Sequence, residues 1–363
     1  MESMGLGSFD ATVTRLGTAL EPNGAADEVD GVLNPAAAIV RDDRLLLYPR
    51  VVAAGNVSRI GIVEALGSET IPSYRRLGYA LEPREPFELR TVPGGYGCED
   101  PRVTFVPVLD RFVMAYTAFG PHGPRIAFAL SRDGFEWERL GLADFSAPGL
   151  PAGDDKDAAF FPEPVISPGG VRSLAFYHRP MLHVSAVDGC ASIPIVLGMP
   201  AADRESTRIA YVPLEPVLRD VRNLVRVAES VVVLTPEADW GTIKTGAGTP
   251  PVAIDEGWLS MFHGVDAELL RDGGCAFRYS AGIVVHDRER PHIVRYRSAR
   301  PVLSPQTDEE RSGTVNDVVF PTGIIPLSGR EFDVYYGMAD SRIGRARLAL
   351  STAASAGEAE SAA

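Results

Sequence analysis

The chain has 363 residues and a net charge of -13, and 45% of its residues are hydrophobic and 23% charged. This length can bury a large core, and the acidity argues against nucleic acid as a partner, because phosphate backbones are bound by basic surfaces. No early segment combines a basic start with an apolar run, and no stretch reaches membrane-spanning length, so we expect neither a signal peptide nor a membrane partner.

Cysteine and lysine are both scarce. Cys98, Cys190 and Cys275 are scattered, and we expect from them neither a disulfide framework nor a metal site, which favours a cytoplasmic protein. The basic residues are almost all arginine, and lysine occurs only at Lys156 and Lys244. Lysine is a compact point charge whereas arginine is a planar fork, so we interpret the two lysines as functional. The alternative is that they persist by chance in a composition that favours arginine.

Three segments differ along the chain. Residues 1–30 show little sustained periodicity, and we expect a lead-in that packs late or frays. Residues 31–350 carry a repeated strand pattern and are expected to form a single catalytic domain. Residues 351–363 are rich in Ser, Ala and Glu and have little apolar bulk, so we expect a flexible tail.

One pattern recurs through the domain: a proline, a short apolar strand, a turn, a short strand that ends in an aromatic residue, and a further strand. Its entries are Asn34-Pro35, Asp100-Pro101, Pro162-Glu163-Pro164, Pro250-Pro251 and Phe320-Pro321. Five degenerate units of this kind predict an all-β fold, a five-bladed β-propeller with its active site in the central funnel. A β-sandwich is the alternative, but it does not predict prolines and aromatic residues in phase.

The stretch from Gly94 to Arg102 leads into the second unit. Flexible glycines come first, followed by Glu99, Asp100, a proline and Arg102. Because glycine permits tight backbone and proline fixes φ and lacks a donor, we expect Asp100 to be held at a strand mouth. Taken alone, such a stretch is a charged turn. In a propeller, equivalent positions of successive blades converge on one axis, and this places Asp100 at the rim of a shared pocket.

Aromatic and polar signatures lie at corresponding places in all five units, and we expect their side chains to line the funnel. They are Tyr48-Pro49-Arg50, Tyr116-Thr117-Ala118, Tyr177-His178-Arg179, Phe262-His263-Gly264-Val265-Asp266 and Tyr336-Gly337-Met338-Ala339-Asp340. Each motif is weak alone, but because all five lie at equivalent positions of their units, together they indicate one site.

Carboxylates and cations both gather at or near these signatures. The carboxylates are Glu99, Asp100, Asp157, Glu163, Asp266, Asp317 and Asp340, and the cations are Arg59, Arg102, Arg125, Lys156, His178 and Arg179. Carboxylates suit glycoside cleavage, which needs an acid and, in an inverting hydrolase, a base; they also suit plain hydroxyl recognition. The cations suit structural ion pairs or a phosphate site. The histidines lack metal-type spacing, so we expect no metal and no organic cofactor.

Several segments occur in a fixed order from about residue 34 to 347. They are Asn34-Pro35, Ser58-Arg59-Ile60-Gly61, Glu99-Asp100-Pro101-Arg102, Lys156-Asp157-Ala158 with Phe161-Pro162-Glu163, His178-Arg179-Pro180, Lys244 to Gly248 with Pro250-Pro251, Phe262-His263-Gly264-Val265-Asp266, Asn316 to Pro321 and Tyr336-Gly337-Met338-Ala339-Asp340. No one segment is specific. Their order and number together make the chain resemble the β-mannoside phosphorylases of glycoside hydrolase family 130.

The resemblance implies an inverting phosphorylase, glycosyltransferase in type, that cleaves β-1,2- or β-1,4-linked manno-oligosaccharides with inorganic phosphate as co-substrate and releases α-mannose 1-phosphate. It implies Asp100 as the general acid, acting through a substrate hydroxyl. The residues implied for phosphate are Arg125, Lys156, His178 and Arg179. Those expected to contact substrate are Asn34, Arg59, Glu99, Arg102, Asp157, Tyr177, Lys244, His263, Asp266 and Asp340. Because phosphate is itself an anionic nucleophile, it makes a second carboxylate base unnecessary.

Two features depart from the family pattern: Asp317, where an apolar residue is expected, and the insertion Pro121-His122-Gly123-Pro124 before Arg125. They leave the linkage and the acceptor sugar open. Two other functions remain as alternatives. One is an inverting β-mannosidase, in which Glu163 or Asp157 helps to activate water. The other is a sugar-binding propeller without catalysis.

Overall fold

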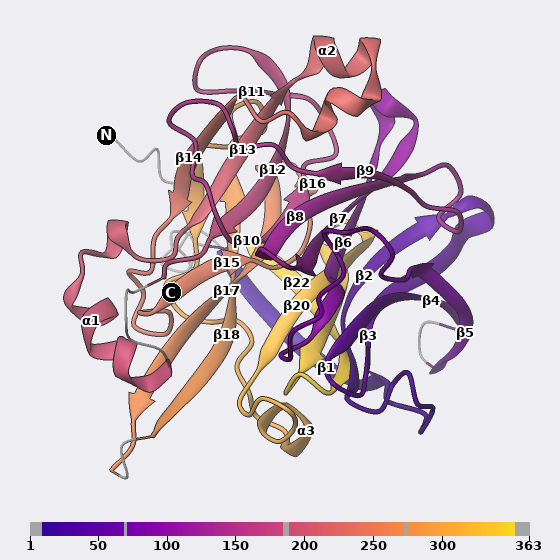
Figure 1. The fold of residues 1–363 in the computed structure, drawn as a ribbon, viewed down its shortest axis with the longest axis vertical. Coiled ribbons are helices and arrows are strands. Elements are labelled where there is room, and N and C mark those ends of the chain that lie inside the picture. Colours follow the sequence, from indigo (N-terminus) through magenta and orange to yellow (C-terminus); the bar gives the residue numbers. More distant parts are fainter. Residues whose placement is uncertain (1–8, 69–70, 184–188, 272–273, 353–363) are drawn as a thin grey trace, which may run out of the picture.

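The structure, a computed structural model, describes residues 9–68, 71–183, 189–271 and 274–352. In these ranges the chain forms strands β1 to β22 and three short α-helices, which are α1 (Ile193–Gly198), α2 (Leu214–Arg219) and α3 (Asp308–Arg311) (Figure 1). The all-β class expected from the strand pattern is therefore confirmed. Most of the expected tail, residues 353–363, lies outside the described residues.

The first part of the chain forms an eight-stranded sheet of order β2-β3-β4-β6-β7-β8-β9, with β5 beside β4. Its strands are β2 (Gly31–Val40), β3 (Arg44–Ala53), β4 (Val57–Ser68), β5 (Ile71–Leu81), β6 (Tyr96–Val106), β7 (Arg111–Gly120), β8 (Gly123–Ser131) and β9 (Glu138–Leu142). A short parallel contact joins its two halves: Val57 pairs with Tyr96, and Ser58 with Gly97. The pairings within each half are antiparallel.

The middle of the chain forms two antiparallel sheets. One has the order β10-β12-β13-β14 with β11 beside β12, and the other has the order β15-β17-β18-β19 with β16 beside β17. Their strands are β10 (Asp155–Phe160), β11 (Val165–Ile166), β12 (Arg172–Pro180), β13 (Thr207–Pro213), β14 (Glu229–Leu234), β15 (Lys244–Ala247), β16 (Val252–Ile254), β17 (Gly257–Leu269), β18 (Cys275–His286) and β19 (Val294–Arg297).

The last sheet contains both ends of the described chain. Its order is β1-β22-β21-β20, with β1 (Phe9–Leu20), β20 (Val319–Ser328), β21 (Glu331–Met338) and β22 (Arg342–Thr352). Strand β1 pairs antiparallel with β22, and Val13 faces Leu348. The expected lead-in of residues 1–30 therefore contains a twelve-residue strand. Its half-buried and exposed positions alternate, as is typical of a strand at the edge of a sheet.

The core lies between groups of strands rather than in one place. One apolar cluster joins β2 to β4 with β6 to β8, so the two halves of the eight-stranded sheet pack face to face. Others join β7 and β8 to β10 and β12, β12 and β13 to β17, β17 and β18 to β21, and β2 and β3 to β20 and β21. Because sheets are covered on both faces, β2 is buried along almost its whole length.

The five expected blades do not appear as five separate sheets, because the described strands form four. The first strands of the successive groups nevertheless meet: β2 contacts β6 and β20, and β10 contacts β6 and β15. Seven of the expected site residues lie near the beginnings of these strands, and this positions that part of the site; they are Asn34, Glu99, Asp100, Arg102, Lys156, Asp157 and Lys244.

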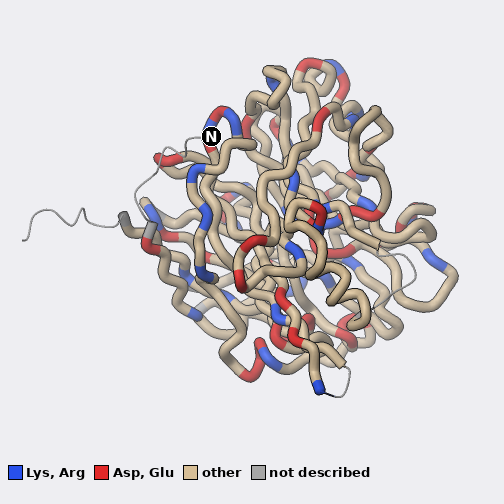
Figure 2. Tube along the Cα trace, turned by 90° about the vertical axis from the view of Figure 1, so that its left-hand side faces the viewer, with Lys and Arg blue, Asp and Glu red and all other residues tan. Residues whose placement is uncertain are grey.

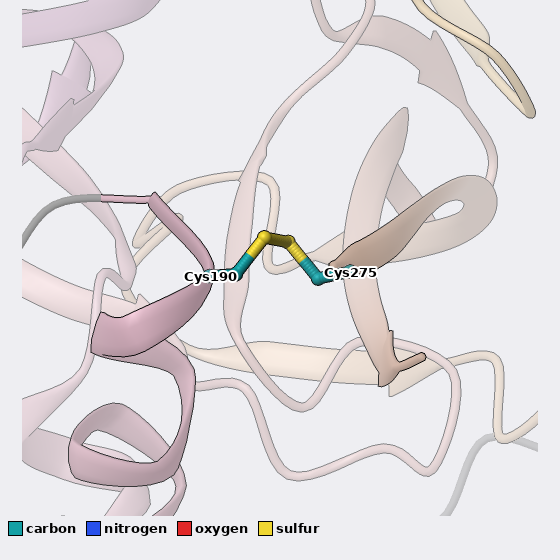
Figure 3. Close-up of a disulfide and its surroundings, with 2 residues drawn as sticks. All are labelled: Cys190 and Cys275. Atoms are coloured by element: carbon teal, nitrogen blue, oxygen red, sulfur yellow. A yellow bond between two sulfur atoms is a disulfide. The ribbon is translucent and has the colours of Figure 1, made fainter. Parts of the chain in front are cut away.

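Our expectation that the cysteines form no disulfide is wrong. Cys190 and Cys275 are bonded, which ties the segment before α1 to the first residue of β18 (Figure 3). The two cysteines are 85 positions apart, so tertiary packing, not a sequence spacing, brings them together. Disulfides persist mainly in oxidising compartments, and the bond therefore argues against the expected cytoplasmic location.

Charged residues of both signs are scattered over the described part of the trace, and acidic and basic positions are interspersed on the face shown (Figure 2). In the described part of the chain, no helix is long and apolar enough to cross a membrane.

Candidate functional site

Three of the first strands carry a polar residue in the same unusual backbone position. Asn34 in β2, Asp100 in β6 and Asp157 in β10 have φ values of 43°, 45° and 61°. The pairing register shifts at each place, so each residue lies in a β-bulge. Asn and Asp tolerate left-handed backbone better than most residues, and bulges re-aim side chains. The repeated entries in the sequence thus turn polar side chains out of their sheets.

Two glycines before Asp100 let β6 lie close to β4. Gly97 has a φ of 124°, and a Cβ there would lie 2.1 Å from the backbone oxygen of Ser58. Gly95 has a φ of 86°, and a Cβ there would lie 2.6 Å from Asn56. Any other residue would push the strands apart, and this is the physical reason for the glycine-rich approach to Asp100.

Asp100 is the centre of the site. Its Oδ1 accepts hydrogen bonds from Asn34 Nδ2 at 2.9 Å and from Arg50 Nη1 at 3.4 Å. Its side chain is 11% exposed, so a bound molecule can reach it. Burial would raise the pKa of Asp100, but the charges of Arg50 and Arg102 lower it below its usual value. The carboxylate is therefore ionised and oriented before anything binds.

A second carboxyl group, that of Asp340, interacts electrostatically with Asp100. Asp340 follows β21 and has a φ of 47°. Burial and the charge of Asp100 raise the pKa of Asp340 to about 6. Two carboxyl groups whose pKa values are pushed in opposite directions are typical of acid–base sites.

Arg50, near the end of β3, joins the acidic side chains. Its Nη2 donates to Glu99 Oε1 at 2.9 Å, and its Nε donates to Ser58 Oγ at 2.9 Å. From the other side, Lys156 Nζ donates to Glu99 Oε2 at 3.4 Å. From the sequence, the signature Tyr48-Pro49-Arg50 is expected to line the funnel with the others, but no catalytic or binding role is assigned to Arg50.

Asp157 anchors a buried network beside Asp100. Arg179 Nε donates to Asp157 Oδ2 at 2.7 Å, and Arg179 Nη1 pairs with Glu205. His263 Nε2 lies 3.7 Å from the same Asp157 oxygen. Burial would raise the pKa of Asp157, but the charges of Arg179 and Arg102 lower it well below its usual value. Burial also lowers the pKa of His263 to about 3, which keeps its ring neutral at pH 7.

Arg102 has a different role from the expected substrate contact, because its side chain is fully buried. Its Nη1 donates to the backbone oxygen of Asp100 at 2.8 Å. Its Nε and Nη2 donate to the backbone oxygens of Gly248 at 3.0 Å and Ala247 at 3.1 Å. Arg102 therefore ties β6 to β15 and holds the backbone of Asp100, out of reach of a ligand.

The signature Tyr177-His178-Arg179 contributes one side chain to the site, not three. His178 is fully buried, and its ring nitrogens bond Asp155 and Ser230, both at 2.7 Å. Tyr177 is buried in an aromatic core cluster. These placements speak against the expected phosphate contact of His178 and substrate contact of Tyr177. Because neighbouring side chains on a strand face opposite sides, His178 cannot share the side of Arg179.

Two expected cations lie at the periphery. Arg125 Nη1 pairs with Asp154, and the Arg125 side chain is 31% exposed. Arg59 Nε donates to Glu82 Oε1 at 3.3 Å. Among the interactions of the described residues, neither arginine contacts the carboxylate of Asp100.

Asp266 lies away from Asp100, in a cleft of about 290 Å³ beside β17 and β18. It pairs across the strands with Arg278. Residues three apart on a strand face opposite sides, so Asp266 points away from the side on which His263 meets Asp157. Burial raises the pKa of Asp266.

Lys244, by contrast, lies on the same side as His263. Its Nζ is 5.6 Å from the centre of the Tyr279 ring, and that ring stacks on His263 with centroids 6.1 Å apart. The two lysines of the chain thus flank the site, Lys156 by an ion pair and Lys244 through aromatic rings.

Glu163 lies beyond the far end of β10 from Lys156 and pairs with Arg288 at 2.8 Å. Its position speaks against the water-activating role of the hydrolase alternative. Among the described residues, no group of three or more His, Cys, Asp or Glu side chains converges as a metal site.

Comparisons of sequence find similar proteins. A model of the family described as β-1,4-mannooligosaccharide phosphorylase matches residues 12–183 and 220–352. A 1,2-β-oligomannan phosphorylase of Thermoanaerobacter sp. (strain X514) is 27% identical over 255 residues, which cover 69% of this chain and 68% of that protein. A β-1,4-mannooligosaccharide phosphorylase of Ruminococcus albus is 36% identical over 115 residues, which cover 31% of this chain and 33% of that protein.

Solved structures show the same fold. The β-1,2-mannobiose phosphorylase of Listeria innocua, in complex with β-1,2-mannobiose, has a TM-score of 0.67 at 22% identity, with 93% of this chain and 96% of that chain covered. Residues 184–219, which include α1 and Glu205, lie outside the ranges matched by the family model. Asp100, Arg50 and Asp157 lie within them.

Proposed function

This chain belongs to glycoside hydrolase family 130, the family of the β-1,4-mannooligosaccharide phosphorylases, and on that premise we propose that it is an inverting phosphorylase of β-mannosides. Its substrates are inorganic phosphate and β-1,2- or β-1,4-linked manno-oligosaccharides, and its products are α-mannose 1-phosphate and a shortened sugar. The names of the similar proteins from Thermoanaerobacter and Ruminococcus support this substrate class.

One observation carries the proposal. Asp100, a carboxylate that a ligand can reach, lies among the cations Arg50 and Lys156 and beside the carboxyl group of Asp340. Glycoside cleavage needs a proton donor, and phosphorolysis needs positive charge to position the anion. A protein that only binds sugar needs no such combination, and we therefore rank that function last.

In the proposed reaction, a phosphate oxygen attacks the anomeric carbon on the face opposite the leaving sugar. The bond from this carbon to the glycosidic oxygen breaks as the bond to phosphate forms, so the configuration inverts. The leaving oxygen takes a proton that comes from Asp100 through a substrate hydroxyl. Asn34 and Arg50 fix the direction in which the Asp100 carboxyl group points.

The proton belongs to a pair of carboxyl groups. In the free protein the pKa of Asp100 is lowered and that of Asp340 is raised to about 6, so the pair carries its proton on Asp340. In the proposed reaction this proton passes to Asp100 when the sugar binds, and Asp100 then delivers it to the leaving oxygen through the substrate hydroxyl. Two groups that interact in this way titrate as a unit. We therefore expect turnover to require that the pair holds one proton when the sugar binds.

Phosphate is assigned to Lys156 and Arg125. These are the expected cations that are partly exposed, with side-chain exposures of 26% and 31%. Arg179 is 6% exposed and already paired with Asp157 and Glu205, so we assign it to supporting those residues. Lysine as a point charge and arginine as a fork both suit phosphate.

The five-bladed arrangement and the cytoplasmic location are also proposals. The two halves of the eight-stranded sheet pack face to face and are joined by a parallel contact of two residue pairs, which supports counting them as two blades.

A cytoplasmic location would need Cys190 and Cys275 to remain reduced. Counting free thiols in the protein purified under non-reducing conditions tests it.

The second candidate is an inverting β-mannosidase on the same fold. The observation that favours it is that both assigned phosphate cations already have carboxylate partners, Glu99 for Lys156 and Asp154 for Arg125. The observation against this candidate concerns the general base that would have to activate water. Asp157 is held ionised by buried cations, which makes it a poor proton acceptor.

The deciding experiment is incubation of the protein with β-1,2- and β-1,4-mannobiose, each with and without phosphate. The expected result is α-mannose 1-phosphate, seen by phosphorus NMR, and no mannose release without phosphate. Equal mannose release in both conditions, without a sugar phosphate, would contradict phosphorolysis and support the hydrolase. If neither disaccharide is turned over and an Asp100→Asn variant still binds them, the result would support a sugar-binding protein without catalysis.

A further inference from the structure

An arginine and a histidine side chain converge on one carboxylate beside the expected phosphate site. Arg125 Nη1 pairs with Asp154 Oδ1, and His183 Nε2 lies 3.0 Å from Asp154 Oδ2. Asp154 is 19% exposed, whereas His183 is 67% exposed. Each carboxylate oxygen thus faces its own cationic partner when His183 is protonated.

The insertion that departs from the family pattern holds this carboxylate in place. Gly123 has a φ of 80°, and a Cβ there would lie 2.6 Å from Asp154 Oδ1, so the carboxylate rests against bare backbone. On its other side, the backbone oxygen of Asp154 accepts a hydrogen bond from Met181 N at 2.8 Å. A larger residue at position 123 would displace the carboxylate from Arg125.

Arg125, the partner of Asp154, is also one of the two cations that we assign to phosphate, and Lys156 is the other. Arginine presents parallel donors that fit two phosphate oxygens as well as two carboxylate oxygens, so both anions compete for one partner. Glu99, the partner of Lys156, is 3% exposed and is also held by Arg50, so it stays in place. Asp154 also has two partners, but it borders solvent and one of them, His183, is 67% exposed, so the carboxylate can turn away.

We propose that Asp154 is a built-in competitor of phosphate: it occupies Arg125 in the free protein and must be displaced before phosphate binds there. The proposal rests on the phosphorylase function, because it takes phosphate as the incoming anion. Asp154 then sets the phosphate concentration at which the protein works, without touching the sugar. Gly123 is the residue that permits this competition.

The test compares wild type with Asp154→Asn, which keeps the shape of the side chain and removes its charge. The matched control is Glu256→Gln, because Glu256 pairs with Arg330 at similar exposures of 16% and 29%, at turns away from the site. Calorimetric titration gives the dissociation constant of inorganic phosphate, and initial rates give KM for phosphate and for mannobiose.

We expect Asp154→Asn to lower the phosphate dissociation constant about twofold to fivefold, the effect of one partly exposed ion pair, and Glu256→Gln to leave it unchanged. KM for phosphate should fall in parallel, while KM for mannobiose should not. Asp154→Ser, which also shortens the side chain, should act in the same direction. An unchanged or raised dissociation constant in both Asp154 variants would overturn the proposal, since a residue that merely holds Arg125 in place would weaken phosphate binding when removed.

Failure of the phosphorylase function has a different signature. In that case wild-type turnover is independent of phosphate, while the calorimetric comparison still reports whether Asp154 competes with the anion. Tighter phosphate binding by Asp154→Asn in a protein that hydrolyses mannobiose would sustain the competition and reject phosphorolysis.

Discussion

Two charged regions of this molecule differ in how their side chains are satisfied. Around Asp100 the carboxylates of Asp100, Glu99 and Asp157 each have a cationic or amide partner, and Glu99 and Asp157 are almost fully buried. In the cleft beside β17 and β18, no hydrogen bond or ion pair joins the described side chains of Asp266, Arg278 and Asp317 to a partner. The first region is organised before a ligand arrives, which is what catalysis by positioned charge requires.

The difference shows that a motif at the equivalent position of a repeat unit does not by itself bring its side chain to the site. Asp100 and Asp157 converge because a bulge re-aims them at the start of a first strand. Asp266 lies on a regular stretch of β17, where alternation decides its direction. The regions can therefore be separated by substitution.

The largest expected effect is on turnover. Asp100→Asn removes the proposed proton donor but keeps its shape, and we expect kcat to fall about 10²–10⁴-fold, the usual loss when a general acid is removed. Asp266→Asn, as the matched change in the other region, should alter kcat by less than about tenfold, since a residue outside the first site holds no reacting atom.

Initial rates of phosphorolysis of β-1,2- and β-1,4-mannobiose measure both variants. A loss in Asp266→Asn as large as that in Asp100→Asn would erase the distinction between the two regions.

The next effect is on stability. Arg102→Met leaves the backbone oxygens of Asp100, Ala247 and Gly248 without their donor and removes an ion pair with Asp157 at 3.7 Å, and we expect the free energy of unfolding to fall by about 3–5 kcal/mol. Arg278→Met removes an exposed charge without a bonded partner and should change it by no more than about 0.5 kcal/mol. Urea denaturation followed by circular dichroism measures both. Should Arg102→Met not fold, Arg102→Lys, which keeps the charge but not the fork, should show a smaller loss of the same sign.

The smallest effect is on the pH dependence. The pKa of Asp340 is raised to about 6 in the folded protein, above its ordinary value. A raised carboxyl pKa favours the fold below the unfolded pKa, and this contribution is lost as the pH rises through about 6. If the reaction needs the proton of the pair, kcat/KM should also fall as the pH rises through about 6.

Asp340→Asn should remove this inflection from the rate profile and from the pH dependence of the urea midpoint. Asp266, whose pKa is raised as well, is in the other region, so Asp266→Asn should leave the rate profile unchanged. A wild-type profile without any change near pH 6 would contradict the role that we give to the pair.

Much of the fold could be predicted from the sequence because the strands are short, apolar and separated by polar turns. The site was predictable where local chemistry decides direction: Asn34, Asp100 and Asp157 share a residue type that tolerates positive φ. It was not predictable where strand alternation or long-range packing decides. His178 and Arg179 are neighbours with opposite directions, and the pairing of Cys190 with Cys275 depends on packing across 85 positions.

The pairing of β1 with β22 has a consequence for how the protein is made. A ribosome releases the chain from the N-terminal side onward, so β1 leaves long before its partner exists, and Val13 meets Leu348 only after β22 has been made. Until then β22 is absent and the edge of β1 is unpaired, which is the condition in which strands recruit wrong partners. The polar residues that alternate along β1 keep that early edge soluble while the rest of the chain is being translated.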